Sequence, residues 1–254
     1  MLPSKKLIFF LVFSVLMISF VFYGYQICYT PNILVEKSAR PLVIPRGATF
    51  KDVQSLLNEG KYIDDIVSFS FLAKLMGYND HVKPGRYLIP SNQTNLQAIR
   101  ILRAGIQEPV KITFNNVRLP KDLSEKITRN LNMKPSEFQS ALIRFAMNNP
   151  YGFNKDNILC MFIPNTYEVY FNVTPEDLIE RLHSEYEKFW TEERRQKAAA
   201  AGLTPIEVSI LASIVQAESV REEEAPVIAG LYINRLKKDI PLQADPTLVF
   251  AVGD

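Results

Sequence analysis

The sequence predicts an α+β protein with an N-terminal transmembrane helix, a small mixed subdomain and a mainly helical domain with short strands. Three observations support this fold class. Residues 7–25 contain no charge, short β-rich runs then alternate with amphipathic helix patterns, and helical periodicity dominates the remainder. We therefore divide the chain into a short tail (1–6), a membrane anchor (7–29), a stalk with the mixed subdomain (30–108) and the helical domain (109–254).

The composition is that of a globular protein and excludes one class of partner. Apolar residues make up 47% of the 254 residues, enough to fill a core in more than one domain. Lys and Arg total 29 against 27 acids, without a dense basic run, so we expect no nucleic-acid partner. His81 and His183 lack metal-ligand spacing, and a disulfide between Cys28 and Cys160 is not expected. We expect no metal and no cofactor.

The uncharged N-terminal run is long enough to cross the hydrocarbon of a bilayer as a helix. Lys5 and Lys6 precede it, and the first charges after it are Glu36 and Lys37. The positive-inside rule then places the N-terminus in the cytoplasm and the rest of the chain outside the membrane. The alternative is a cleaved signal peptide, but "YGYQICY" contains no small-residue cleavage site. We favour an uncleaved single-pass anchor in the cytoplasmic membrane.

The mixed subdomain shows the order strand, helix, helix, strand. A β-rich run at 42–44 precedes a helix capped near Thr49 and stopped at Gly60. "DDIVSFSFLAKLMGY" predicts a second helix, "VKPGRYLIP" a turn and strand, and "NLQAIRILRAG" a helix closed by Gly105. The order resembles a LysM-like glycan-binding module. A similar pattern restarts at 108–131, so an internal duplication stays open.

The helical domain contains one apolar and aromatic interruption, "NILCMFIPNTYEVYFNVTPEDL". Asn165, Thr166 and Tyr167 in this stretch either line a sugar cleft or form a packed aromatic turn. One long helix is expected next, over 174–202. It places four residues at core spacing: Leu178, Leu182, Tyr186 and Phe189.

The following helix carries the most informative acid of the chain. Thr204, Pro205 and Glu207 form a capping-box signature at its start. Leu211, Ile214 and Val215 lie seven, four and three residues before Glu218, so that all four share one stripe of the helix. We therefore expect Glu218 to point inward.

A buried carboxylate needs either a cation or a proton. Two interpretations of Glu218 stay open: an internal ion pair with Arg221 or Arg235, or a general acid that holds its proton near neutral pH. The acids Glu222–Glu224 suit the start of the next helix, where negative charge complements the helix dipole.

That next helix is expected to pack five apolar or aromatic residues: Val227, Ile228, Leu231, Tyr232 and Leu236. Asn234 and Arg235 remain as polar groups near its end. In "PLQADPT", Gln243, Asp245 and Thr247 either converge on a ligand hydroxyl or form an ordinary turn.

Several of these stretches together resemble one family. "LASIVQAES", "APVIAGLYINRL", "IPLQADPT" and "MFIPNTYEVY", behind a membrane anchor, are similar to the YceG-like endolytic murein transglycosylases. The resemblance implies a lyase that cleaves the MurNAc–GlcNAc bond of nascent peptidoglycan, leaves 1,6-anhydroMurNAc ends and so terminates strand elongation. It implies that Glu218 is the catalytic acid. Its implied partners are glycan strands, the cytoplasmic membrane and peptidoglycan synthases.

The resemblance also implies a set of substrate-binding residues: Asn165, Tyr167, Ser219, Asn234, Gln243, Asp245 and Thr247. Three departures from the family pattern stand out. Cys160 and Met161 occupy positions where the family often has an acid and a glycine, Gln216 replaces an acid two residues before Glu218, and the family pattern continues beyond Asp254. A non-catalytic glycan-binding scaffold for wall synthases and a glycoside hydrolase that uses water are the alternatives.

Overall fold

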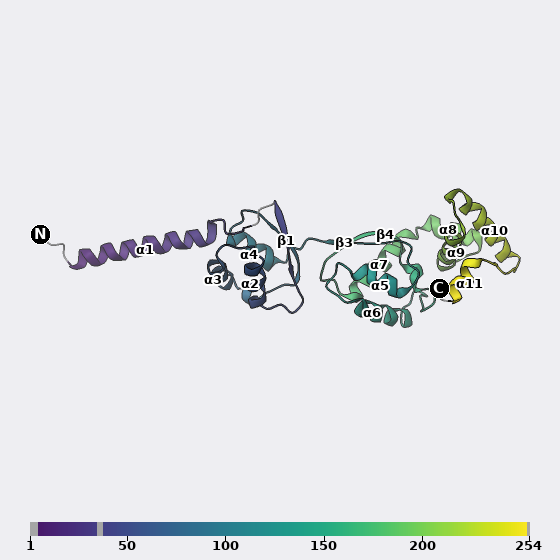
Figure 1. The fold of residues 1–254 in the computed structure, drawn as a ribbon, viewed down its shortest axis with the longest axis horizontal. Coiled ribbons are helices and arrows are strands. Elements are labelled where there is room, and N and C mark those ends of the chain that lie inside the picture. The colour runs from purple at the N-terminus through teal and green to yellow at the C-terminus, as the bar shows by residue number, and fades with distance from the viewer. Residues whose placement is uncertain (1–4, 35–37, 253–254) are drawn as a thin grey trace. The chain divides into compact units, whose positions relative to one another are not determined.

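The computed structural model describes residues 5–34 and 38–252 of the chain. It confirms a mixed α and β architecture that is mostly helical with short strands (Figure 1). Glu36 and Lys37, on which the orientation of the anchor partly depends, lie outside the described residues. The chain divides into two compact units, which we describe separately. The first comprises Met1–Ile112, Asn130–Asn132 and Tyr167–Val173; the second comprises Thr113–Arg129, Met133–Thr166 and Thr174–Asp254.

Helix α1 (Lys5–Tyr29) is the single unbroken helix of the described chain that is long and apolar enough to cross a membrane. Its side chains are exposed along almost the whole length, whereas Ile27 in the last turn is buried. The helix is apolar on all sides and has no polar side to face water. Such a helix is typical of a lipid-embedded segment or a signal sequence.

The predicted order of strand, helix, helix and strand in the first unit is confirmed. It is formed by β1 (Ala39–Ile44), α2 (Phe50–Glu59), α3 (Ile66–Leu75) and β2 (Gly85–Pro90), with the 3₁₀ turn η1 (Tyr78–Asp80) before β2 and α4 (Asn95–Ala104) after it. Thr49 caps α2 as predicted, and the structure adds a capping box with Asp52. Gly105 ends α4 with φ of 76°, a left-handed conformation that glycine adopts without steric cost.

Strands β1 and β2 pair in antiparallel fashion, with Leu42 opposite Tyr87 and Ile44 opposite Gly85. Alternate residues of both strands point into one core, and Ile44 and Tyr87 are fully buried there. The same core holds side chains from α1 to α4, including Ile27, Val53, Phe69 and Ile99. The end of α1 is therefore part of this unit's packing.

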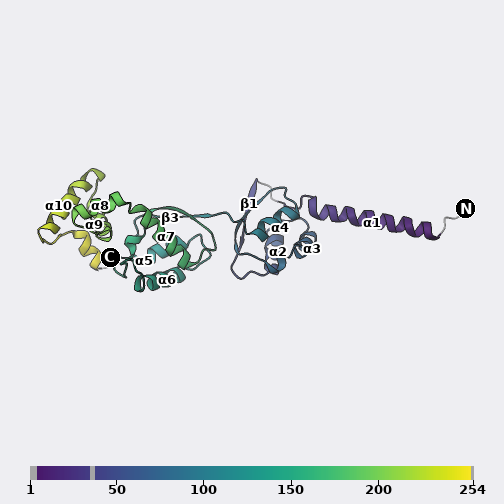
Figure 2. The ribbon, with the colours of Figure 1, turned by 180° about the vertical axis from the view of Figure 1, so that it is seen from behind.

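The second unit is assembled mainly from helices (Figure 2). In chain order these are α5 (Pro120–Thr128), α6 (Pro135–Met147), η2 (Ile158–Met161), α7 (Pro175–Phe189), α8 (Glu192–Ala201), α9 (Pro205–Glu218), η3 (Glu222–Glu224), α10 (Ala225–Lys237) and α11 (Asp245–Val252). Strands β3 (Val110–Phe114) and β4 (Asn165–Val169) pair in a second two-stranded sheet, and the division between the units passes through both strands.

The prediction of one long helix over 174–202 is wrong, because the chain breaks between α7 and α8. Trp190 leaves helical geometry with ψ of 70°, and the Thr191 side chain accepts a hydrogen bond from the Arg194 amide to start α8. Leu178, Leu182 and Tyr186 are buried as predicted, but Phe189 at the break is 37% exposed.

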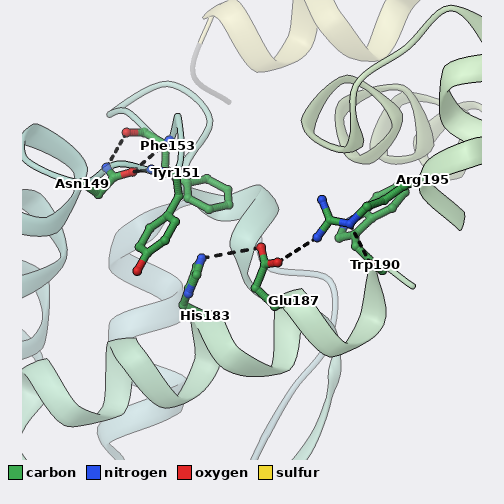
Figure 3. A network of polar contacts seen from close by, with 7 residues as sticks. All are labelled: Asn149, Tyr151, Phe153, His183, Glu187, Trp190 and Arg195. Atoms are coloured by element: carbon green, nitrogen blue, oxygen red, sulfur yellow. Dashed lines mark hydrogen bonds and ion pairs between the residues drawn. The ribbon is translucent and has the colours of Figure 1, made fainter. Parts of the chain in front are cut away.

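A cluster around His183 holds this junction in place (Figure 3). The Tyr151 ring stacks on the imidazole with centroids 3.8 Å apart, and a Glu187 carboxylate oxygen lies 3.8 Å from His183 Nε2. Arg195 of α8 donates to Glu187 at 2.8 Å and to the Trp190 carbonyl at 2.9 Å. Arg195 therefore connects the first turn of α8 to the last turn of α7.

Candidate active site at the end of α9

Helix α9 has the start that its sequence predicts and ends at the candidate acid. The Thr204 side chain accepts from the Glu207 amide at 3.3 Å, and Glu207 accepts from the Thr204 amide at 2.7 Å. Glu218 is the last helical residue, and Ser219 caps the end with an extended backbone. The Ser219 hydroxyl donates to the Arg221 carbonyl at 2.5 Å, which turns the chain toward η3.

The expectation that Glu218 is buried is wrong. Leu211 and Val215 on the same stripe are each 7% exposed, but Glu218 is exposed. Helical spacing predicted the stripe correctly, yet the apolar cluster that covers it is small and centred on Leu211, Val215, Tyr232 and Ala244. Glu218 lies on the same stripe but beyond the residues that this cluster covers, so its side chain reaches solvent.

The alternative interpretation, an ion pair with Arg221 or Arg235, is not found within the described residues, where no salt bridge involves Glu218. Arg235 instead donates to the Pro241 carbonyl at 3.0 Å and to the Gln243 side-chain oxygen. Its role is to hold the segment between α10 and α11. The carboxylate of Glu218 thus lies on the surface, with no cation paired to it in the part of the chain that the structure describes.

Tyr232 on α10 is the functional candidate that sequence reasoning treated only as packing. Its side chain is 4% exposed and belongs to the cluster that supports α9. Burial raises the pKa of the Tyr232 phenol, and the Glu218 carboxylate raises it further. Arg235 lowers this pKa, and Asp245, the weakest of the four influences, raises it. The Tyr232 hydroxyl is therefore close enough to Glu218, Arg235 and Asp245 for their charges to affect it. The polar residues Asn234 and Arg235, which follow Tyr232 closely in the sequence, could have indicated that this tyrosine lies near the site.

The predicted packing of α10 is wrong for three of its five residues. Val227, Leu231 and Leu236 are 75%, 52% and 44% exposed, whereas Tyr232 is buried and Ile228 is partly buried against the cluster. The cluster with α9 covers the side of α10 that carries Ile228 and Tyr232, and the apolar residues Val227, Leu231 and Leu236 on its other sides face outward.

Gln243, Asp245 and Thr247 lie at the start of α11. Gln243 has φ of 52°, and its side-chain oxygen accepts a hydrogen bond from Arg235. Asp245 begins α11 and is exposed, in place of the expected turn. The Thr247 hydroxyl donates to the Ala244 carbonyl at 2.6 Å.

The remaining predicted site residues have different surroundings. Asn234 on α10 is exposed, and Asn165 is exposed with its side-chain oxygen accepting from the Thr166 amide at 2.7 Å. Tyr167 belongs to the first unit and is only 6% exposed. The prediction that Tyr167 offers a stacking face for a sugar is therefore wrong, since a buried ring has no free face.

Fold and site together define an α+β protein with an N-terminal apolar helix and an exposed carboxylate, Glu218, in its helical unit. The model of the YceG-like family matches residues 42–254. The chain therefore belongs to the YceG-like family.

Curated relatives are similar to this chain at low identity. An endolytic murein transglycosylase from Streptococcus pneumoniae serotype 2 is 23% identical, covering 96% of this chain and 49% of the relative. One from Bacillus subtilis strain 168 is 24% identical, covering 86% of this chain and 66% of the relative. The chain thus spans about half the length of the pneumococcal relative. A crystal structure of a YceG-like protein from Listeria monocytogenes aligns with a TM-score of 0.46 at 21% identity, over 86% of this chain and 77% of that one.

Proposed function

We propose that this protein is a membrane-anchored lytic transglycosylase that cleaves MurNAc–GlcNAc bonds of nascent peptidoglycan and leaves 1,6-anhydroMurNAc ends. The observation that carries the proposal is the position of Glu218, a solvent-facing carboxylate at the end of α9 with no cation paired to it among the described residues. The names of the curated relatives support the same activity. Such cleavage of nascent strands would end their elongation.

One carboxyl group can serve both halves of this reaction. Glu218 in its acid form gives its proton to the glycosidic oxygen as the bond from that oxygen to C1 of MurNAc breaks. The C6 hydroxyl oxygen of the same sugar then bonds to C1, and its proton passes to the Glu218 carboxylate, which restores the acid. No water enters the product, in contrast to glycoside hydrolysis with two carboxylates.

The exposure of Glu218 changes the physical account of how it works. A core-buried acid would exclude water in the free protein, whereas a surface acid is solvated until a ligand covers it. We infer that the glycan strand itself removes water from Glu218 when it lies across α9 and α10. Asn234, the Gln243 amide, Asp245, Ser219 and Thr247 are then the groups available to orient sugar hydroxyls, with Asn165 as a further candidate.

The test compares Glu218→Gln with Glu223→Gln on uncross-linked glycan strands. Glu223 is an exposed acid of η3 that we place outside the chemistry, so it controls for the loss of one charge nearby. We expect Glu218→Gln to lose anhydro product by at least about 100-fold, the range of general acid catalysis. Circular dichroism checks that both variants fold. Equal anhydro product from both variants would remove Glu218 from the mechanism.

The alternative of a hydrolase is separated by the source of oxygen in the product. In H₂¹⁸O, a transglycosylase gives unlabelled anhydro ends, whereas a hydrolase gives reducing ends that carry ¹⁸O. Asp245 is the acid that could activate water, since it shares the surroundings of Tyr232 with Glu218. Labelled reducing ends that disappear in Asp245→Asn would establish hydrolysis.

A glycan-binding scaffold is the second candidate function, and a groove in the first unit favours it. This shallow groove has a volume of about 410 Å³ and is lined by residues 45–48 with Asp52, Ser55, Leu56 and Glu59. Together with the strand and helix order it supports a LysM-like module that holds peptidoglycan. Pelleting of Glu218→Gln with insoluble peptidoglycan tests this role, and adding Ser55→Trp should weaken it by filling the groove. Peptidoglycan synthases are the partners that such a scaffold would serve.

A further inference from the structure

Helix α3 presents an apolar stripe to solvent. Val67, Phe71 and Leu75 are 71%, 59% and 73% exposed, and their spacing of four residues places them along one side of the helix. The opposite side packs Phe69 and Leu72 into the core of the first unit. The core of the first unit covers one apolar side of α3. The exposed apolar side is typical of a surface that contacts a second apolar partner.

The start of α3 is fixed to the end of α1 by a buried polar network. The Asn95 side chain is 1% exposed and donates at 3.1 Å both to the Ile27 carbonyl of α1 and to the Ser68 hydroxyl of α3. Asn32, just after α1, donates to the Asn95 side chain at 2.7 Å and to the Asp65 carbonyl at 2.8 Å. Figures 1 and 2 both show α3 at the end of this unit that α1 enters.

The length of α1 sets the depth of this junction relative to a bilayer. Its 25 residues rise about 37 Å at 1.5 Å each, against about 30 Å of hydrocarbon. If the uncharged run 7–25 fills the hydrocarbon, the last turn would lie among the lipid headgroups, where exposed Tyr25 and Tyr29, with rings 5.1 Å apart, suit an interfacial aromatic belt. Ile27 between them is already in the core of the unit.

We propose that α3 lies in the headgroup region of the bilayer that α1 spans, with Val67, Phe71 and Leu75 in contact with lipid. This inference rests on the proposed membrane anchor and goes beyond it, because it assigns a second membrane contact to the folded unit. The charges nearby are compatible with it. Asp64 and Asp65 are both exposed at the start of α3, where Asp65 accepts from the Val67 and Ser68 amides as the helix cap, and Lys74 flanks the stripe.

The test places single tryptophans in the full chain in nanodiscs of phosphatidylethanolamine and phosphatidylglycerol, with or without brominated acyl chains. Trp190 is the only native tryptophan, so Trp190→Phe provides the background. Phe71→Trp probes the stripe, and Phe13→Trp probes the middle of α1. Ile106→Trp is the matched exposed control, since Ile106 is 64% exposed and follows the far end of α4, about 15 Å along its axis from Asn95.

We expect bromination to reduce the emission of Phe71→Trp and Phe13→Trp by roughly half or more, and to leave Ile106→Trp unchanged. Leu75→Trp repeats the measurement at the other end of the stripe. Quenching of Phe13→Trp alone would overturn the lipid contact and leave the anchor standing. A blue-shifted but unquenched Phe71→Trp would assign the stripe to a protein surface instead. An unquenched Phe13→Trp would overturn both the anchor and the contact.

Discussion

At the scale of single residues, the candidate site combines an exposed acid with a buried phenol. Glu218 faces solvent at the end of α9, and Tyr232 lies beneath the surface in the cluster that holds α9 and α10 together. The cluster has few members, so each side chain contributes a large share of the packing. Tyr232 therefore affects the stability of the site as well as its electrostatics.

Replacing Tyr232 with Ala should lower the free energy of unfolding of the second unit by about 3–5 kcal/mol, the usual cost of truncating a large buried aromatic residue. The unfolding is followed in urea by the fluorescence of Trp190, which lies in this unit. Leu231→Ala on the same helix is the control, because Leu231 is 52% exposed and should change stability by less than about 0.5 kcal/mol. Equal effects of the two variants would contradict the packing described for α10.

His183 should make the second unit less stable in acid. Burial lowers the pKa of its imidazole, and the nearby Glu187 carboxylate opposes that shift without reversing it. The unfolded chain then binds more protons than the folded chain, so stability is full above the ordinary histidine pKa of 6.5 and is lost as pH falls through and below it.

Urea unfolding between about pH 7.5 and about pH 5 tests this prediction. His183→Gln should show a smaller loss of stability across that range than the wild-type chain. His81→Gln provides the control, since His81 is exposed in the first unit. A wild-type pH dependence in His183→Gln would show that another group is responsible.

At the scale of elements, the ends of helices decide where the candidate site lies. The capping box at Thr204 fixes where α9 begins, and fourteen residues later the helix delivers Glu218 to the surface. Gly202, with φ of 79°, ends α8 just before and allows the chain to turn into α9. A bend of 74° between α8 and α9 results.

Thr204→Ala should destabilise the second unit by about 1 kcal/mol, because one amide at the start of α9 loses its acceptor. Thr204→Ser keeps the hydroxyl and should retain most of the stability. Denaturant midpoints of the two variants, read from Trp190 fluorescence, measure the difference. Similar midpoints for Ala and Ser would mean that the capping hydrogen bond contributes little.

At the scale of the whole molecule, the two units divide the proposed tasks. The first contains the proposed anchor helix α1 and the groove near Ser55, and the second contains Glu218. The proposed orientation, with the N-terminus in the cytoplasm, would place both units on the side of the membrane where peptidoglycan is made.

Cysteine labelling in intact cells tests this orientation. In a background of Cys28→Ser and Cys160→Ser, a membrane-impermeant maleimide should label Ile106→Cys, whose position is exposed in the first unit. Ser4→Cys should react only after the membrane is permeabilised. The opposite pattern would invert the topology, and release of the chain without residues 1–29 would establish a cleaved signal.

The sequence by itself determined the local features of this protein. Hydropathy predicted α1, and the cap residues Thr49 and Thr204 predicted where α2 and α9 start, because these signals act within one or two helical turns. The motifs around Glu218 indicated the family for the same reason, since they are read along the chain. Only the tertiary structure decided which faces are covered: Glu218 is exposed, Tyr167 is buried and the stripe on α3 is open. Helical periodicity fixes the side of a helix on which a residue lies, but burial depends on whether a distant element packs over that side.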